Sequence, residues 1–233
     1  MKEIIIFSPL LLFVFCSVAP IVPPQPTNRI VLAEFFTQDG WSYCALAEQA
    51  LNSLTLFYGD TLAIVAYNRN FTPSEIDTTR RQYYENPLDP SLVLDGTDKL
   101  FIEDTNYYST YDQHITIAKS ATPYFNLGLN ARASTNSGTI QLHIVTADTI
   151  PEDSIVAFVV ICEDSIDGML KNFNYVCKYL YYFPANLTYP DSLDTTIVFS
   201  NTIQPSKMRA VAFIQNIDTK KILQAITKKF EEE

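Results

Sequence analysis

Residues 30–51 join a strand-like segment to a helix-like segment through a short polar turn, and this unit limits the folds open to the chain. Ile30–Phe36 is rich in residues that favour strands, and Thr37–Gly40 supplies the turn. From Cys44 onward, apolar residues recur at helical spacing on one stripe, which contains Leu46, Ala50, Leu51, Leu54 and Phe57. The helix dipole makes a thiol at a helix start more acidic. The segment therefore predicts an α/β fold with a thiol at a strand–helix junction.

The same alternation of strand and helix continues to about residue 121. The expected order is β-α-β-α-β-β-α, over Arg29–Phe36, Cys44–Tyr58, Thr61–Tyr67, Thr72–Tyr84, Ser91–Leu94, Lys99–Ile102 and Tyr107–Ser120. Thr61–Tyr67 is an almost continuous apolar run, which is typical of a strand that is covered on both faces. Residues 28–121 therefore predict an α/β domain with a mixed sheet.

From Pro123 the pattern changes to strands without long helices between them. Six strand-like runs are Tyr124–Ala131, Thr139–Ala147, Ser154–Cys162, Asn174–Phe183, Thr195–Phe199 and Arg209–Gln215. Turn residues such as Asp167-Gly168 separate them. Residues 122–233 therefore predict a β-sandwich domain, and Lys220–Ile226 is either a last strand or a helix.

The N-terminus has the pattern of an export signal. Lys2 precedes the apolar run Ile4–Phe15, and small residues follow, so residues 1–19 predict a signal peptide. Residues 20–27 then form a proline-rich spacer suited to an extended tether. Lipidation at Cys16 and an uncleaved membrane anchor are the two alternatives to cleavage. In each case we expect a protein of the periplasm, outer membrane or extracellular space, with membrane contact only through this segment.

Three of the four cysteines lie in the expected mature chain. An odd number of thiols in an oxidising compartment suggests one disulfide and one free thiol. Cys162 and Cys177 lie in two strand-like runs, so a cross-strand disulfide between them is one interpretation. Two buried thiols that pack as small apolar side chains are the other.

Composition and residue spacing argue against several classes of function. The net charge is −10, and no Lys/Arg run is longer than the pairs Arg80-Arg81, Lys220-Lys221 and Lys228-Lys229, so we expect no nucleic-acid partner. Neither His114 nor His143 has a partner at metal-ligand spacing, so no metal site is predicted. The chain has no phosphate-binding glycine loop, and we expect no cofactor. None of these patterns predicts an oligomeric state.

Several motifs together carry a family resemblance. Glu34-Phe35-Phe36-Thr37, the turn, Cys44 and the helix after it resemble the thioredoxin-like superfamily. The stretch Pro90–Gly96 (PSLVLDG) is similar to the P-T-x-x-x-D-G stretch of that family, whose proline is cis and faces the active site. The tail segments IVAFVVICEDSI, NYVCKYLYYFP and MRAVAFIQNIDTKKILQA resemble the sandwich half of secreted, outer-membrane-associated bacterial thioredoxin-family proteins. The resemblance implies a thioredoxin-like α/β domain followed by an immunoglobulin-like sandwich.

The redox motif of this family is degenerate here. The family pattern resembles T-G-x-x-C-x-x-C-P, and the matching residues run from Thr37 to Ala45, with Trp41 in place of the attacking cysteine. In a second alignment Trp41 matches the tryptophan that often precedes that cysteine, and Ser42 takes the attacking position. Both alignments lack the attacking thiol. Dithiol exchange needs two thiols, so Cys44 alone supports at most a slow single-thiol reaction.

The leading functional hypothesis is therefore a non-catalytic binding or structural protein of the cell envelope. Trp41, Tyr43, Pro90 and Ser91 are the candidate lining of a groove for an extended peptide or an envelope protein. One alternative is a redox protein that performs single-thiol disulfide exchange through Cys44. Another is an adhesion or anchoring module that acts through the sandwich.

Overall fold

The computed structural model describes residues 28–101, 105–150 and 153–233. The expected signal peptide (1–19), the lipidation alternative at Cys16 and the spacer (20–27) lie outside the described residues. Within the described part of the chain, no helix is both long and apolar enough to span a bilayer.

The first part of the chain forms four strands and three α-helices in the predicted order. They are β1 (Val31–Thr37), α1 (Ser42–Tyr58), η1 (Gly59–Thr61), β2 (Leu62–Asn68), α2 (Ser74–Tyr83), β3 (Ser91–Leu94), β4 (Asp98–Phe101) and α3 (Tyr107–Ala118). β1 pairs in parallel with β2 and antiparallel with β3, and β3 pairs antiparallel with β4. The β-α-β-α-β-β-α order and the mixed sheet predicted for this region are confirmed.

The second part of the chain is almost entirely strand. It contains β5 (Phe125–Ala133), β6 (Ser137–Thr146), β7 (Ile155–Glu163), β8 (Ile166–Asp167), β9 (Asn172–Phe173), β10 (Val176–Pro184), β11 (Ser192–Ser200), η2 (Pro205–Lys207), β12 (Met208–Asn216), β13 (Ile222–Lys229) and β14 (Glu231–Glu232). Each of the six predicted runs overlaps a long strand, and the ambiguous segment Lys220–Ile226 contributes to strand β13. The short β8–β9 hairpin and β14 were not predicted.

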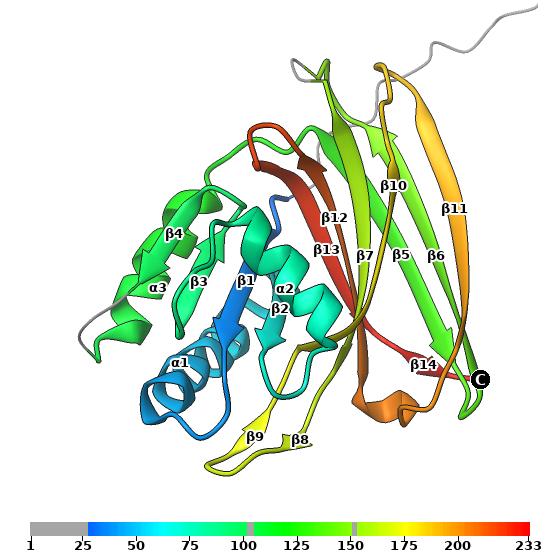
Figure 1. The fold of residues 1–233 in the computed structure, drawn as a ribbon. Helices are drawn as coiled ribbons and strands as arrows, with labels where there is room; N and C mark the ends of the chain where they lie inside the picture. The colour runs from blue at the N-terminus through cyan, green and yellow to red at the C-terminus, as the bar shows by residue number, and fades with distance from the viewer. Residues whose placement is uncertain (1–27, 102–104, 151–152) are drawn as a thin grey trace, which may run out of the picture.

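One large sheet includes strands from both parts of the chain. Its order is β13-β12-β7-β10-β2-β1-β3-β4, and a second sheet has the order β11-β6-β5-β14. The large sheet crosses the predicted boundary between residues 121 and 122, where Val176 of β10 pairs with Ala66 of β2. Figure 1 shows the helices gathered around one half of this sheet, while the second sheet faces the other half.

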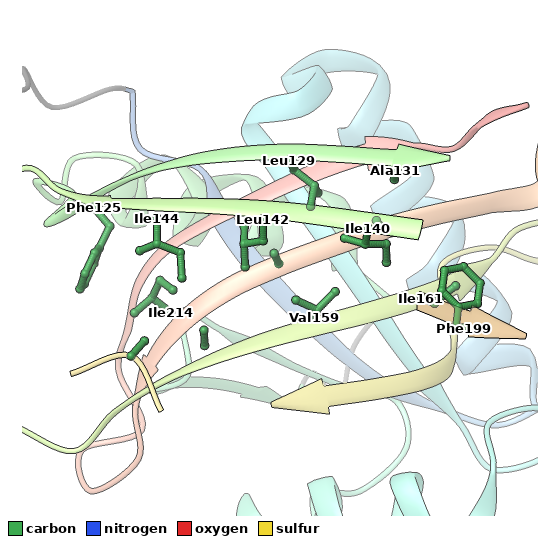
Figure 2. Packing of buried hydrophobic residues seen from close by; sticks show 14 of the residues in the cluster. Phe125, Leu129, Ala131, Ile140, Leu142, Ile144, Val159, Ile161, Phe199 and Ile214 are labelled. Atoms are coloured by element: carbon green, nitrogen blue, oxygen red, sulfur yellow. The ribbon is translucent and has the colours of Figure 1, made fainter. Parts of the chain in front are cut away.

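Three apolar clusters hold these layers together. The first fills the space between the two sheets, with Phe125, Ile144 and Leu142 of the small sheet opposite Val159 and Ile214 of the large one (Figure 2). The second packs α1 and α3 against one face of β1, β2 and β3, and the third lies on the opposite face of the large sheet. Alternate residues of β1 enter the second and third clusters, so both faces of this strand are buried.

The β3–β4 turn lies directly against the β12–β13 hairpin. Gly96 has φ +78°, and a Cβ atom at this position would lie 1.8 Å from the carbonyl oxygen of Lys220. Asp95 accepts hydrogen bonds from the backbone N–H of Leu32 (2.9 Å) and from Arg29 (2.6 Å), and its own carbonyl accepts from the N–H of Ile222 (3.0 Å). Glycine is therefore required here, because the two turns approach too closely for a side chain.

Candidate functional site

The candidate site lies where β1 ends and α1 begins. Gly40 adopts φ +80°, and Asp39 accepts a hydrogen bond from its N–H at 2.7 Å. Trp41 is the N-cap residue of α1 and makes no side-chain capping hydrogen bond. Its side chain faces solvent, as does that of Tyr43, with 54% and 53% of their surfaces exposed. The first turn of α1 therefore presents aromatic rings in place of a thiol.

Cys44 is fully buried beneath this turn. Burial raises the pKa of its thiol, against the lowering effects of the Thr37 hydroxyl and the Gln38 backbone; Asp89 raises it further and Arg81 lowers it. Disulfide exchange needs an accessible thiolate, and Cys44 is neither ionised near neutral pH nor exposed. The geometry gives the candidate redox thiol a packing role.

Asp89 and Pro90 are joined by a cis peptide bond, as the family resemblance predicted. Pro90 and Ser91 are both buried, and the hydroxyl of Ser91 donates to the carbonyl of Leu88. Of the four residues expected to line a groove, only Trp41 and Tyr43 offer exposed side chains. Pro90 and Ser91 therefore do not contribute exposed side chains to the surface at this site, contrary to the groove that the motifs suggested.

The β8–β9 hairpin adds two exposed apolar residues beside the start of α1. Met169 and Leu170, at its tip, have 80% and 56% of their surfaces exposed. The N–H of Met169 donates to both carboxylate oxygens of Asp39, at 2.9 and 3.0 Å, which fixes the tip beside the start of α1. Figure 1 shows the hairpin extending from the large sheet beside α1.

Helix α1 and the hairpin enclose a shallow groove. Its volume is about 490 Å³, and it is lined by Ser42, Ala45, Leu46, Gln49, Leu170 and Lys171. We call the exposed apolar set around it the α1–hairpin surface, which consists of Trp41, Tyr43, Leu46, Met169 and Leu170. The sequence motifs indicated its α1 side only, since Met169 and Leu170 lie far from α1 along the chain.

Charged residues beside the site are engaged in structural ion pairs. Asp89 accepts from Arg81 at 2.8 Å, and its other carboxylate oxygen accepts from Arg69. Arg81 also pairs with Asp77, at 2.8 and 2.9 Å, and donates to the carbonyl of Thr37. These bonds fix the residue before Pro90 relative to the end of β1.

The two histidines lie apart from this surface. His114 lies 2.6 Å from Asp98 through Nδ1, and His143 lies 2.7 Å from Asp194. Over residues 28–101, 105–150 and 153–233, no group of three or more His, Cys, Asp or Glu side chains is arranged to hold a metal ion. Each histidine pairs with a single carboxylate at the protein surface.

Cys162 and Cys177 occupy directly opposite positions on β7 and β10. Both are buried and both are free thiols. Burial raises the pKa of Cys177 and raises that of Cys162 well above its usual value. The cross-strand disulfide stays a prediction, and the register places its two partners side by side.

No family model matches this chain, and no curated protein sequence matches it either. Among solved structures, HBP35 of Porphyromonas gingivalis superposes with a TM-score of 0.74 at 12% identity, over 89% of this chain and 77% of that one. A protein of Agrobacterium tumefaciens superposes with a TM-score of 0.56 at 15% identity, over 89% of this chain and 97% of that one. A domain of the outer membrane lipoprotein Omp28 from P. gingivalis reaches 0.34 at 14% identity, over 48% of this chain and 91% of its own. At these identities, the first two superpositions establish a shared fold.

Proposed function

We propose that this chain is a non-catalytic binding protein of the cell envelope, built on a thioredoxin-type scaffold, which holds an extended apolar peptide segment of a partner. The element order around β1 and α1 and the cis bond before Pro90 support the scaffold assignment. The export pattern of residues 1–19 supports the location. The partner segment is expected to lie on the α1–hairpin surface.

One observation carries this proposal: the site that would need an exposed thiol presents exposed apolar side chains. Trp41 and Ser42 are the residues that the two alignments place at the attacking position, and both are exposed. Cys44, the thiol that remains, is buried. Aromatic residues and methionine are the side chains that binding surfaces favour, because they bury large areas and adapt to different partners.

Peptide binding can be measured with the intrinsic fluorescence of Trp41, which is the one tryptophan in the sequence. The probe is the S-carboxymethylated insulin B chain, an unfolded apolar peptide that contains no tryptophan, so the emission comes from Trp41 alone. We expect it to shift the Trp41 emission and to bind with a measurable Kd. Leu46→Glu places a charge in the groove and should weaken binding by at least about tenfold, since it opposes apolar burial.

Leu56→Glu is the matched control, because Leu56 is also an exposed leucine of α1 but lies at the far end of the helix, with 89% of its surface exposed. This variant should bind the probe like the wild type. Equal loss of binding in both variants, or no binding by the wild type, would contradict the proposal.

The catalytic alternative is tested by the reduction of insulin. Because Cys44 is buried and protonated, wild type and Cys44→Ser should both leave the uncatalysed rate unchanged. Turnover by the wild type that Cys44→Ser abolishes would replace the binding proposal with single-thiol exchange.

A further inference from the structure

Two carboxylates of the α1 region hold the β8–β9 hairpin in place. Asp39 accepts the backbone N–H of Met169 at the tip, and Glu48 accepts the backbone N–H of Asn174 at the base, at 2.9 Å. Phe173 adds an apolar contact, with its ring centroid 5.6 Å from that of Phe71. The hairpin therefore depends on α1 for its position, and Glu48 is the buried member of the pair.

The environment of Glu48 is unfavourable for a charge. Only 2% of its surface is exposed, since it lies on the inner face of α1, one turn after Cys44. Its Oε1 atom accepts from Asn174, but within the described ranges its Oε2 atom has no hydrogen-bond partner. The ammonium group of Lys171 lies 3.7 Å from Oε2, beyond hydrogen-bond distance.

The groups that face Glu48 come from α1, from the hairpin and from the residues after it. Asn52 on α1 and Asn174 are neutral amides, and Lys171 on the hairpin is the cation. Tyr175 follows the hairpin, and burial raises the pKa of its phenol, so it is neutral at the pH of interest. Two charged groups contact Tyr175: Asp164 accepts from the Tyr175 N–H at 2.8 Å, and Arg209 lies over the Tyr175 ring. The opposite charges of Asp164 and Arg209 offset each other at Glu48.

We propose that ionisation of Glu48 loosens the β8–β9 hairpin from α1, so that the α1–hairpin surface is intact at acidic pH and divided at alkaline pH. The consequence for binding rests on the proposed function of that surface, whereas the loosening itself does not. Opening the hairpin would expose Glu48 to water and remove the cost of burying a carboxylate whose Oε2 atom accepts no hydrogen bond and meets the Lys171 ammonium only at 3.7 Å.

The direction of the pH dependence follows from linkage. Burial raises the pKa of Glu48 from its ordinary 4.5 to about 7, against the lowering effects of Asn174, Lys171 and Asn52. The closed hairpin therefore binds a proton more tightly than the open one, and closure is favoured at pH values below 7. Between pH 6 and pH 8, the equilibrium constant for opening should rise by about tenfold.

Loosening would separate the two sides of the α1–hairpin surface. Met169 and Leu170 belong to the hairpin, whereas Trp41, Tyr43 and Leu46 belong to α1. A peptide that contacts both sides would then bind more weakly at pH 8 than at pH 6. The proton-linked change in affinity cannot exceed the change in the opening equilibrium.

Hydrogen exchange tests the proposal without any partner. The backbone amides of residues 169–174 are followed at pH 6 and pH 8, corrected for the intrinsic pH dependence of exchange. In the wild type we expect the opening constant of these amides, and of the Asn174 N–H in particular, to increase about tenfold. Glu48→Gln keeps an acceptor of the same shape but cannot ionise, so its opening constant should not change with pH.

Two further variants complete the experiment. Lys171→Met removes the cation that favours the ionised form, so the transition should move to higher pH in a variant that keeps the buried carboxyl group. Glu75→Gln is the control, because Glu75 is an exposed glutamate of α2, and it should behave like the wild type. The proposal would be overturned if the opening constant of the wild type did not change with pH. It would also be overturned if Glu48→Gln showed the same pH dependence as the wild type. Exchange with the expected dependence supports loosening even if the insulin B chain does not bind, in which case only the proposed function fails.

Discussion

At the residue scale, the guanidinium of Arg80 is a buried positive charge that pairs with a carboxylate, Glu34, that has no exposed surface. It donates to Glu34 at 2.6 and 3.1 Å and lies between the rings of Tyr83, Tyr84, Phe158 and Phe213, with centroid distances of 4.9–5.8 Å. Glu34 also accepts from the hydroxyls of Tyr67 and Tyr84. A fully hydrogen-bonded pair of this kind is tolerated in a core, whereas either charge alone is not.

Glu34→Gln should destabilise the protein by about 3–5 kcal/mol, because Arg80 would stay buried and charged without its counter-ion. The free energy of unfolding in urea measures this loss. Arg132→Gln is the control, since Arg132 and Glu231 form an ion pair whose side chains are 57% and 52% exposed. The control should leave the urea midpoint unchanged. A Glu34→Gln midpoint equal to that of the wild type would show that the pair contributes nothing.

The sequence indicated part of the site at this scale. Cys44 and Trp41 could be identified because they lie within one short motif, and the cis bond before Pro90 was expected from the family resemblance of residues Pro90–Gly96. The Glu34–Arg80 pair could not be identified, because its two residues lie 46 positions apart, and Gln215, which accepts from Arg80 at 3.4 Å, lies 135 residues further along the chain. Tertiary contacts at this separation leave no periodic signal in a single sequence.

At the element scale, the long elements and the four-residue strands β3 and β4 were predicted, whereas the two-residue strands were not. Strands β5, β6, β7 and β10 each have nine or ten residues, which is enough for a strand pattern to be detected. Strands β8 and β9 have two residues each, and only the turn residues between them were visible in the sequence. The half of the α1–hairpin surface that these strands carry was therefore missed.

Gly96→Ala should disrupt the contact between the β3–β4 turn and the β12–β13 hairpin. A methyl group would overlap the Lys220 carbonyl, and backbone atoms on both sides would have to move. Gly59→Ala is the matched control, because Gly59 also has a positive φ (+55°) but no atom lies within 4 Å of its Cβ position. Both variants carry backbone strain of about 1–3 kcal/mol. The overlap should make Gly96→Ala less stable than Gly59→Ala by a further 2 kcal/mol or so.

Urea unfolding of both glycine variants provides the comparison. Equal destabilisation would mean that strain alone explains the effect and that the two turns can separate without cost.

Cys162 and Cys177 should form a disulfide when the protein folds in an oxidising buffer. Directly opposite residues on antiparallel strands have Cα atoms about 4.5–5.5 Å apart, which is within the range for a bridge. Closure of a loop of about 15 residues would stabilise the fold by roughly 3 kcal/mol. Peptide mass spectrometry without reductant should find the two cysteines in one linked peptide pair that lacks two hydrogen atoms. Recovery of both as free thiols after oxidative refolding would contradict the prediction.

At the scale of the whole molecule, the large sheet joins the two predicted regions. The sequence indicated the two kinds of structure but not their connection, because the β10–β2 pairing involves a single residue pair in register, Val176 with Ala66. The third apolar cluster also combines both regions, with Leu32, Phe36 and Val65 from the first and Val160 and Phe213 from the second. A buried strand has the same apolar sequence pattern whether its own region or the other half of the chain covers it.

This shared face predicts that the first region does not fold alone. In a fragment of residues 28–121, Leu32, Phe36 and Val65 would lose the strands that cover them, and Arg80 would lose Phe158, Phe213 and Gln215. The exposed apolar area and the incomplete network each oppose folding. We expect the fragment to have no near-ultraviolet circular dichroism signal of fixed aromatic packing and no cooperative urea transition.

The full chain should correspondingly unfold in one transition. Trp41 fluorescence reports on the first region, and the exchange of the β5 and β6 amides reports on the small sheet, which is separate from the sheet that contains β1. The large sheet contains strands of both regions, so unfolding of either region exposes apolar surface of the other. The two probes should therefore give the same midpoint in urea. Two separate midpoints, or a cooperatively folding fragment of residues 28–121, would show that the boundary near residue 121 divides independent domains. The continuous sheet would then be a docking contact between them.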